Sequence, residues 1–155
     1  HDISMILNLI NEKVISVDAF GGSYIKSKVK DTSLTILKFK NNIKAHIFVS
    51  WLHPYKDQRL VVIGEKGMIV FADVAENSNK LLHYNHKVKW DGEIPLVSKA
   101  EGKKIPFNFK KEPLKIECES FINWIKKNKK PLSDGKEGLK VLKILEYAKI
   151  KLSKW

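Results

Sequence analysis

The spacing of apolar residues changes twice along this chain, and this change constrains the fold more than any other feature. Residues 3–11 carry apolar side chains at helical spacing, and residues 113–152 do so again. Between residues 15 and 71, apolar side chains follow the two-residue period of β-strands in several short runs. An order of one helix, several strands and two final helices predicts an α+β fold.

The expected strands are separated by short turns, which favours antiparallel pairing of neighbours. Asn41-Asn42 suits a tight turn because asparagine tolerates positive φ, and Gly64 and Gly67 bracket a second turn. Gly21-Gly22 is expected to break or bulge the first strand. The strands expected are 15–19, 34–40, 43–52, 59–63 and 68–71.

Apolar residues lie on both faces of the expected sheet. In the strand 43–52, one face carries apolar residues such as Ile47 and Val49. Phe48 and Leu52 lie on the opposite face, among polar residues. A sheet with one wet face would alternate more cleanly. We therefore expect a mostly antiparallel open sheet with helices packed on one face and the other face used for oligomerisation.

The segment 74–112 is the least regular part of the sequence. Short strands are expected at residues 81–84 and 105–109, and prolines and glycines punctuate the remainder. A long irregular segment in a small domain is more often a functional loop or an interface arm than core.

Two helices are expected to close the chain. Pro113 suits the first position of one helix, and Asp134 with Glu137 forms a capping pattern for the other. The expected buried stripes are Leu114, Cys118, Phe121, Ile122 and Ile125 on the first helix, and Val141, Leu145, Ala148 and Leu152, widened by Leu142, on the second. Trp51, Trp90 and Trp124 are expected in a core or interface.

The net charge of +12 is carried almost wholly by lysine, with Arg59 as the one arginine. A solvated lysine-rich surface explains this best, attraction of an anionic substrate comes second, and nucleic-acid binding comes third. No apolar run is long enough to span a bilayer, so we expect no membrane partner. The single cysteine, Cys118, fits a reducing, cytoplasmic setting.

The glycines of this chain join strands and do not open a helix after a strand, so no dinucleotide site is expected within it. The histidines lack the spacing of a metal site, and we expect no metal.

The block Val49-Ser-Trp-Leu-His-Pro to Gly64-Glu-Lys-Gly67-Met resembles the C-terminal domain of the glucose-fructose oxidoreductase, inositol dehydrogenase and MocA family. So do the opening His1-Asp2-Ile3 and the ending from Glu112 to Gly138. The likeness covers nearly the whole chain and is weakest from residue 74 to residue 111. Among branches, it is most similar to dehydrogenases of nucleotide-linked sugars and their uronic acids.

This resemblance implies that residues 1–155 are the C-terminal substrate-binding and oligomerisation domain of a two-domain oxidoreductase. An N-terminal Rossmann domain, absent from the chain, would bind NAD or NADP and carry a catalytic lysine. The implied activity is oxidation of a sugar hydroxyl, with the isolated domain inactive and the full-length enzyme a homodimer or homotetramer. The family motif Asp-x-x-x-His-Asp would end at His1-Asp2.

Four residues are candidates for the site. His1 is the expected catalytic acid/base, because an imidazole titrates near neutral pH, although a terminal residue without a role is the alternative. Asp2 could bind substrate or orient His1, but capping of the first helix is favoured. Lys56 and Arg59 could bind an anionic substrate or the cofactor phosphates, but pairing with Asp57 or Glu65 at a subunit interface is favoured.

Two other functions stay open at this point. The charge of +12 would also suit a basic nucleic-acid-binding module, against which the near absence of arginine argues. A non-catalytic scaffold of the same fold is the third reading, since the residues that would decide it lie upstream of this chain.

Overall fold

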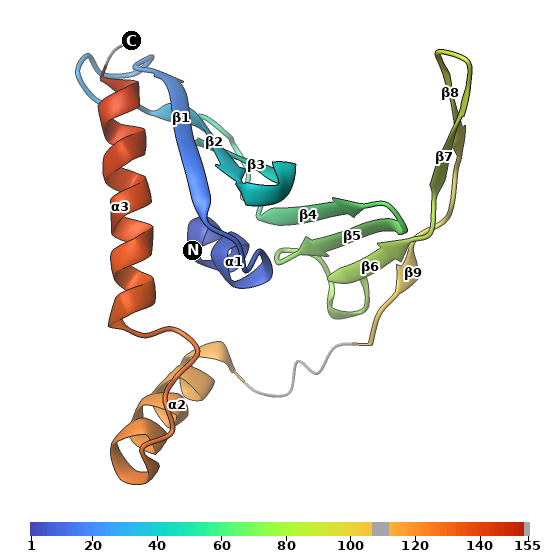
Figure 1. The fold of residues 1–155 in the computed structure, drawn as a ribbon. Helices are drawn as coiled ribbons and strands as arrows, with labels where there is room; N and C mark the ends of the chain where they lie inside the picture. Colours follow the sequence, from blue (N-terminus) through green and yellow to red (C-terminus); the bar gives the residue numbers. More distant parts are fainter. Residues whose placement is uncertain (107–111, 154–155) are drawn as a thin grey trace. The chain divides into compact units, whose positions relative to one another are not determined.

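The computed structural model describes residues 1–106 and 112–153, and it confirms the α+β class (Figure 1). Its elements follow one another in this order: α1 (Asp2–Leu9), β1 (Val14–Gly22), β2 (Thr32–Phe39), η1 (Lys40–Asn42), β3 (Lys44–Ser50), β4 (Arg59–Gly64), β5 (Gly67–Ala72), η2 (Asn77–Asn79), β6 (Leu81–Tyr84), β7 (Lys87–Asp91), β8 (Ile94–Ser98), β9 (Lys103–Lys104), α2 (Pro113–Lys127) and α3 (Gly135–Leu152).

The strands form three sheets where one open sheet was expected. The first has the order β1-β2-β3, the second β4-β5-β6-β9, and the third contains β7 and β8 alone. Every strand pair in the described residues is antiparallel, as the short turns predicted.

The chain divides into two compact units. One contains residues 1–54 and 120–155, and the other contains residues 55–119. All the buried apolar side chains of the described residues belong to the first unit: Ile3, Ile6, Ala19, Leu37, Phe39, Ile144 and Ala148. The second unit therefore has sheets without a buried core of their own.

The core of the first unit lies on one face of β2. Thr35, Leu37 and Phe39 alternate as buried residues along this strand, as a two-residue period requires. Burying a side chain such as Leu37 or Phe39 stabilises the fold by about 1.5–3 kcal/mol. Opposite Leu37 in the neighbouring strands are Val17 and Ala45, which share this face.

Helix α3 lies along β1 and closes this core (Figure 1). At the contact a Cβ on Gly21 would overlap the carbonyl oxygen of Thr32 and lie 2.8 Å from Cδ2 of Leu152. The expectation that Gly21-Gly22 interrupts the strand was wrong, because β1 continues to Gly22 and pairs with β2 throughout. Gly21 allows close packing of the helix and the neighbouring strand, and Gly22 leaves room for the ring of Tyr24. The irregular register lies near Val14 instead.

The buried face of α3 is rotated from the predicted one. Ile144 and Ala148 are buried, whereas Leu145 is 49% exposed and Leu142 is 59% exposed. Residues three and four positions before Ala148 both flank its face, and the spacing alone did not decide which one packs. The cap was predicted correctly, since the carboxylate of Asp134 accepts the backbone N–H of Glu137 at 2.9 Å.

Helix α2 begins at Pro113 as predicted, but its apolar stripe is not buried. Leu114, Phe121 and Ile125 are each more than half exposed, and Cys118 is exposed as well. The prediction of a buried stripe on this helix, Cys118 included, was wrong for the chain by itself. Trp51, Trp90 and Trp124 are also 40% or more exposed, so none of them is a core residue here.

The turns follow their predicted chemistry. Asn41 and Asn42 adopt φ values of 65° and 61° between β2 and β3. Gly67, at φ 143°, ends the turn between β4 and β5. The expected strand 81–84 is confirmed as β6. Of the expected strand 105–109, residues 105 and 106 are not in a strand, and residues 107–111 lie outside the described residues.

Candidate active site

His1 stands immediately before α1 and is exposed. Its carbonyl oxygen accepts the N–H of Met5 at 3.0 Å, so its backbone belongs to the first turn of the helix. Its imidazole makes no capping hydrogen bond to the helix. A side chain in this position is accessible to a substrate, which general acid–base chemistry requires.

Helix α1 is held by apolar and polar contacts with the rest of its unit. Ile3 and Ile6 are buried on one face of the helix. The hydroxyl of Ser4 donates a hydrogen bond of 2.6 Å to Oε1 of Glu137, in the first turn of α3. These contacts position the helix start, and therefore His1, against α3.

The start of α3 is itself fixed by charge. Lys130 lies 2.8 Å from the carboxylate of Asp134, and the same carboxylate accepts the N–H of Glu137. The hydrogen bond from Lys130, followed by the one from Glu137, lowers the pKa of Asp134 from 3.8 to about 2. The carboxylate therefore stays charged at every physiological pH, and it anchors the turn that carries Glu137.

Asp2 does not have the favoured capping role in full. It is exposed in the first turn of α1, and the helix start has no side-chain cap. A carboxylate there still interacts favourably with the helix dipole.

The end of β3 is tied to the start of β2 by two hydrogen bonds, and a third is local to the end of β3. The N–H of Trp51 donates to the carbonyl of Asp31 at 2.9 Å. The hydroxyl of Ser50 accepts the N–H of Leu52 at 3.1 Å and lies 2.9 Å from the hydroxyl of Thr32. These bonds direct the chain out of the sheet toward residue 54, where the first unit ends.

Lys56 and Arg59 are exposed in the second unit, just before and at the start of β4. Arg59 forms an ion pair of 3.7 Å with Asp57, which was one of its expected partners. Both side chains are more than 40% exposed, so this pair stabilises little and leaves the guanidinium accessible to an anion.

The structure thus forms two pairs from the four candidates. His1 and Asp2 are neighbours at the start of α1, and Lys56 and Arg59 are neighbours ahead of β4. The pairs belong to different units.

Asp31 was missed by the sequence analysis. It is 5% exposed, and its Oδ2 accepts the N–H groups of Tyr24 and Ile25 at 2.7 and 2.8 Å. Its position directly before β2 was the available signal, because aspartate often organises a turn through its side chain. Its role is to hold the loop between β1 and β2.

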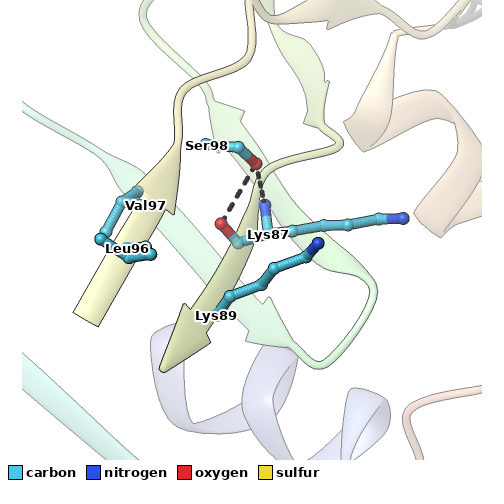
Figure 2. Close-up of a pocket in the computed structure, with 5 residues that line it drawn as sticks. All are labelled: Lys87, Lys89, Leu96, Val97 and Ser98. Carbon is cyan, nitrogen blue, oxygen red and sulfur yellow. Dashed lines mark hydrogen bonds between the residues drawn. The ribbon is translucent and has the colours of Figure 1, made fainter. Parts of the chain in front are cut away.

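A shallow hollow on the hairpin of β7 and β8 is lined by Lys87, Lys89, Leu96, Val97 and Ser98, and by none of the four candidates (Figure 2). Within residues 1–106 and 112–153, no three histidine, cysteine or acidic side chains gather as metal ligands.

Gly64 and Gly67 lie in an antiparallel hairpin, which is not the strand-to-helix turn that holds a dinucleotide. No described helix has the length and apolar content to cross a membrane.

Residues 1–70 match the model of the GFO/IDH/MocA C-terminal domain. This part of the chain is therefore similar to a GFO/IDH/MocA C-terminal domain. The recognition made from the sequence is therefore confirmed, and the matched residues include all four candidates. No curated protein sequence matches the chain.

Solved structures share this fold at low sequence identity. UDP-N-acetylglucosamine 3-dehydrogenase from Acidithiobacillus ferrooxidans is similar with a TM-score of 0.77 and 17% identity, over 98% of this chain and 44% of that one. The WlbA dehydrogenase from Bordetella pertussis, in complex with NADH and UDP-GlcNAcA, has a TM-score of 0.67 and 20% identity over 99% and 40%.

The same fold also occurs with a different substrate. Biliverdin reductase from Synechocystis, in complex with biliverdin and NADP+, has a TM-score of 0.68 and 14% identity over 97% of this chain and 44% of that chain. This chain thus spans less than half the length of these structures. The fold alone does not determine the substrate.

Proposed function

We propose that this chain is the substrate-binding and assembly domain of an NAD(P)-dependent oxidoreductase that oxidises a hydroxyl of a nucleotide-linked sugar or uronic acid. The observation that carries the proposal is the family match over residues 1–70, which contains His1, Asp2, Lys56 and Arg59. Two structures of the same fold, a UDP-N-acetylglucosamine dehydrogenase and a dehydrogenase with bound UDP-GlcNAcA, support the substrate class.

We place the nicotinamide cofactor on a Rossmann domain outside this chain. The described strands pair only in antiparallel fashion, whereas a dinucleotide is held by a parallel strand–helix–strand unit. When bound there, the cofactor would accept the hydride. Tight binding of NAD or NADP by residues 1–155 alone, measured by calorimetry, would contradict this division of labour.

His1 would take the proton of the substrate hydroxyl. Its exposed imidazole precedes an anchored helix, so it can accept a proton without losing an intramolecular partner that caps the helix. General-base catalysis of this kind contributes about 10²–10⁴-fold to the rate. In this proposal Asp2 binds a substrate hydroxyl or orients the imidazole beside it.

Lys56 and Arg59 would bind the anionic part of the substrate. Both are exposed, and the weak pair of Arg59 with Asp57 competes little with a phosphate or carboxylate. The charge of +12 would raise the rate at which anions arrive.

The assembly role rests on uncovered apolar surface. The second unit has no buried apolar side chain among its described residues, and β4 and β5 expose Val61, Val62, Ile63 and Ile69. A second copy packed on the face that carries Val62 and Ile69, in a dimer or tetramer, would remove part of this area from water.

The decisive experiment uses the longer protein that contains this chain. Its sequence before His1 should contain a glycine-rich βαβ start, a Lys-Pro pair and an aspartate four residues before the histidine. An upstream sequence without them would leave the non-catalytic scaffold as the remaining function for this fold.

Kinetics then test the residue roles in that protein. His1→Asn should lower kcat by about 10²–10⁴-fold with a UDP-sugar and NAD, whereas His46→Asn, at an exposed position of β3, should leave kcat unchanged. Lys56→Ala or Arg59→Ala should raise KM about tenfold at similar kcat, and Lys66→Ala serves as the exposed-lysine control. Equal effects of His1→Asn and His46→Asn would contradict the assignment of the base.

The charge of the chain also permits a direct test of the nucleic-acid alternative. Binding of duplex or single-stranded DNA at low salt that weakens steeply as salt rises would favour that function. A flat titration would remove it.

A further inference from the structure

Strands β7 and β8 form a hairpin, called the arm here, that comprises residues 87–98. The two strands pair with each other and with no other described strand. All ten of their residues are exposed. A two-stranded hairpin is at best marginally stable in water, so an arm of this kind requires further strands or a packing partner.

The arm has one apolar face and one mixed face. Val88 lies opposite Val97, and Trp90 lies opposite Pro95, so these four side chains share a face that carries no charge. On the other face Lys87 lies opposite Ser98 and Lys89 opposite Leu96. Figure 2 shows both lysine side chains extending to the same side, and two hydrogen bonds of the Ser98 hydroxyl to the backbone of Lys87 closing the base of the arm.

The two edges of the arm differ in what they can bind. A two-residue turn, Gly92-Glu93 with Gly92 at φ 57°, joins Asp91 to Ile94. The residues that flank such a turn form a hydrogen-bonded pair, and bonded and non-bonded pairs alternate from there. Trp90 and Pro95 therefore direct their backbone groups outward.

Pro95 has no N–H, so the outer edge of β8 lacks a donor at the end next to the turn. The outer edge of β7 presents the N–H and C=O groups of Val88 and Trp90 without interruption. Strand β7 is therefore the edge that can accept another strand.

We propose that β7 pairs antiparallel with β7 of a second copy of this chain, about a two-fold axis at Trp90. In this register Lys89 lies opposite the partner's Asp91, and Lys87 lies toward the partner's turn, which carries Glu93. The two Trp90 side chains meet on the apolar face. The product is one continuous sheet with two strands from each copy, which satisfies the requirement for more than two strands.

The order of charges on the arm identifies the second copy as the occupant. The base of β7 carries Lys87 and Lys89, its other end carries Asp91, and Glu93 follows in the turn. When two such strands run antiparallel, the basic end of each lies opposite the acidic end of the other. Only a two-fold axis between two copies brings all of these charges opposite one another together. A uniformly acidic partner strand would meet the acidic tip unfavourably, and a basic one would meet the lysines.

This strand-edge contact differs from the assembly through a sheet face proposed above, and it does not depend on the enzymatic function. Self-association of the chain is therefore the measurement that tests this contact. Catalytic activity of the longer protein does not test it.

The test is sedimentation of the full chain at about 0.15 M salt, where non-specific repulsion between basic copies is screened. Lys89→Glu places a carboxylate opposite the partner's Asp91, and Asp91→Lys places an ammonium opposite the partner's Lys89. Each variant alone should associate about tenfold more weakly than the parent chain, because like charges directly opposite repel.

Combination of the two variants gives a sharper result. An equimolar mixture of the Lys89→Glu and Asp91→Lys chains should form mixed pairs with an affinity close to that of the parent chain. A chain carrying both substitutions should likewise recover self-association. The matched control is Lys66→Glu, at an exposed lysine in the turn between β4 and β5, which should change nothing.

Three outcomes would overturn the proposal. The first is a parent chain that remains monomeric at every concentration. The second is association that is unaffected by both single variants, which would locate the contact elsewhere, for example on a sheet face. The third is weakening by both variants without recovery in the mixture, which would assign the arm to a different partner. Far-UV circular dichroism establishes that each variant has kept its fold.

Discussion

The hydroxyl of Ser4 lies 2.6 Å from a carboxylate oxygen of Glu137, and this bond joins the first turn of α1 to the first turn of α3 across 133 positions of sequence. His1 precedes the same turn of α1, so the bond helps to set where the candidate base stands. Hydrogen bonds to a charged group are stronger than neutral ones, which makes this link a measurable part of the unit's stability.

Ser4→Ala should lower the free energy of unfolding by about 1 kcal/mol. Glu137→Ala should cost a similar amount, and the double variant should lose less than the sum because both substitutions remove the same bond. Urea denaturation measures all three. Ser27→Ala, at an exposed serine, is the control, and strictly additive losses would show that the two side chains are not coupled.

Two neighbouring residues on α3 test which face of that helix is buried. Ile144 is 6% exposed and Leu145 is 49% exposed. Ile144→Ala should cost about 2–5 kcal/mol, whereas Leu145→Ala should cost less than about 1 kcal/mol. Equal losses in chemical denaturation would contradict the packing of α3 against β1 as described.

Two glycines should respond to alanine in opposite directions. A Cβ at Gly21 would overlap the backbone of Thr32, so Gly21→Ala should destabilise the first sheet and lower Tm. Gly138 lies inside α3 with open space around a Cβ, so Gly138→Ala should raise the free energy of unfolding by about 0.5–1 kcal/mol. A loss of stability in Gly138→Ala would show that something covers this turn.

The pH dependence of stability should reveal the cap of α3. The pKa of Asp134 is lowered from 3.8 to about 2 by Lys130 and by the N–H of Glu137. Because the folded state favours the charged form, this contribution is complete above about pH 4 and is lost as pH falls toward 2. Asp134→Asn should therefore have a lower urea midpoint near neutral pH and a smaller further loss between pH 4 and pH 2.

Lys130→Met provides the matched test of the cause. With the largest contributor removed, the pKa of Asp134 should move back toward 3.8, which a carboxyl NMR titration records. A pKa that stays near 2 would mean that the backbone N–H groups alone hold the charge.

The local pattern of the sequence predicted elements whose cause is local. Asparagine at positive φ formed the turn after β2, Pro113 began α2, and Asp134 capped α3, each through atoms within a few residues. The candidates at His1, Asp2, Lys56 and Arg59 came from motif resemblance, and the family match covers all of them. Their roles stay predictions.

The local sequence pattern could not predict contacts between residues that are distant in the sequence. Asp31 is polar and precedes a strand, yet its burial depends on backbone groups of Tyr24 and Ile25 that only the folded loop brings to it. The face of α3 was misjudged because Ile144 and Leu145 are equally apolar, and contact with β1 decides between them.

By itself, the sequence determined the α+β class, the antiparallel pairing and the starts of α2 and α3, because backbone period, turn chemistry and caps act over short distances. The tertiary structure decided what is covered: it buried Ile144 and Asp31, left the apolar stripe of α2 exposed, and divided the strands among three sheets. Burial depends on which surfaces meet in space. The sequence shows that a residue is apolar, but it does not show whether that residue packs against this chain or against another molecule.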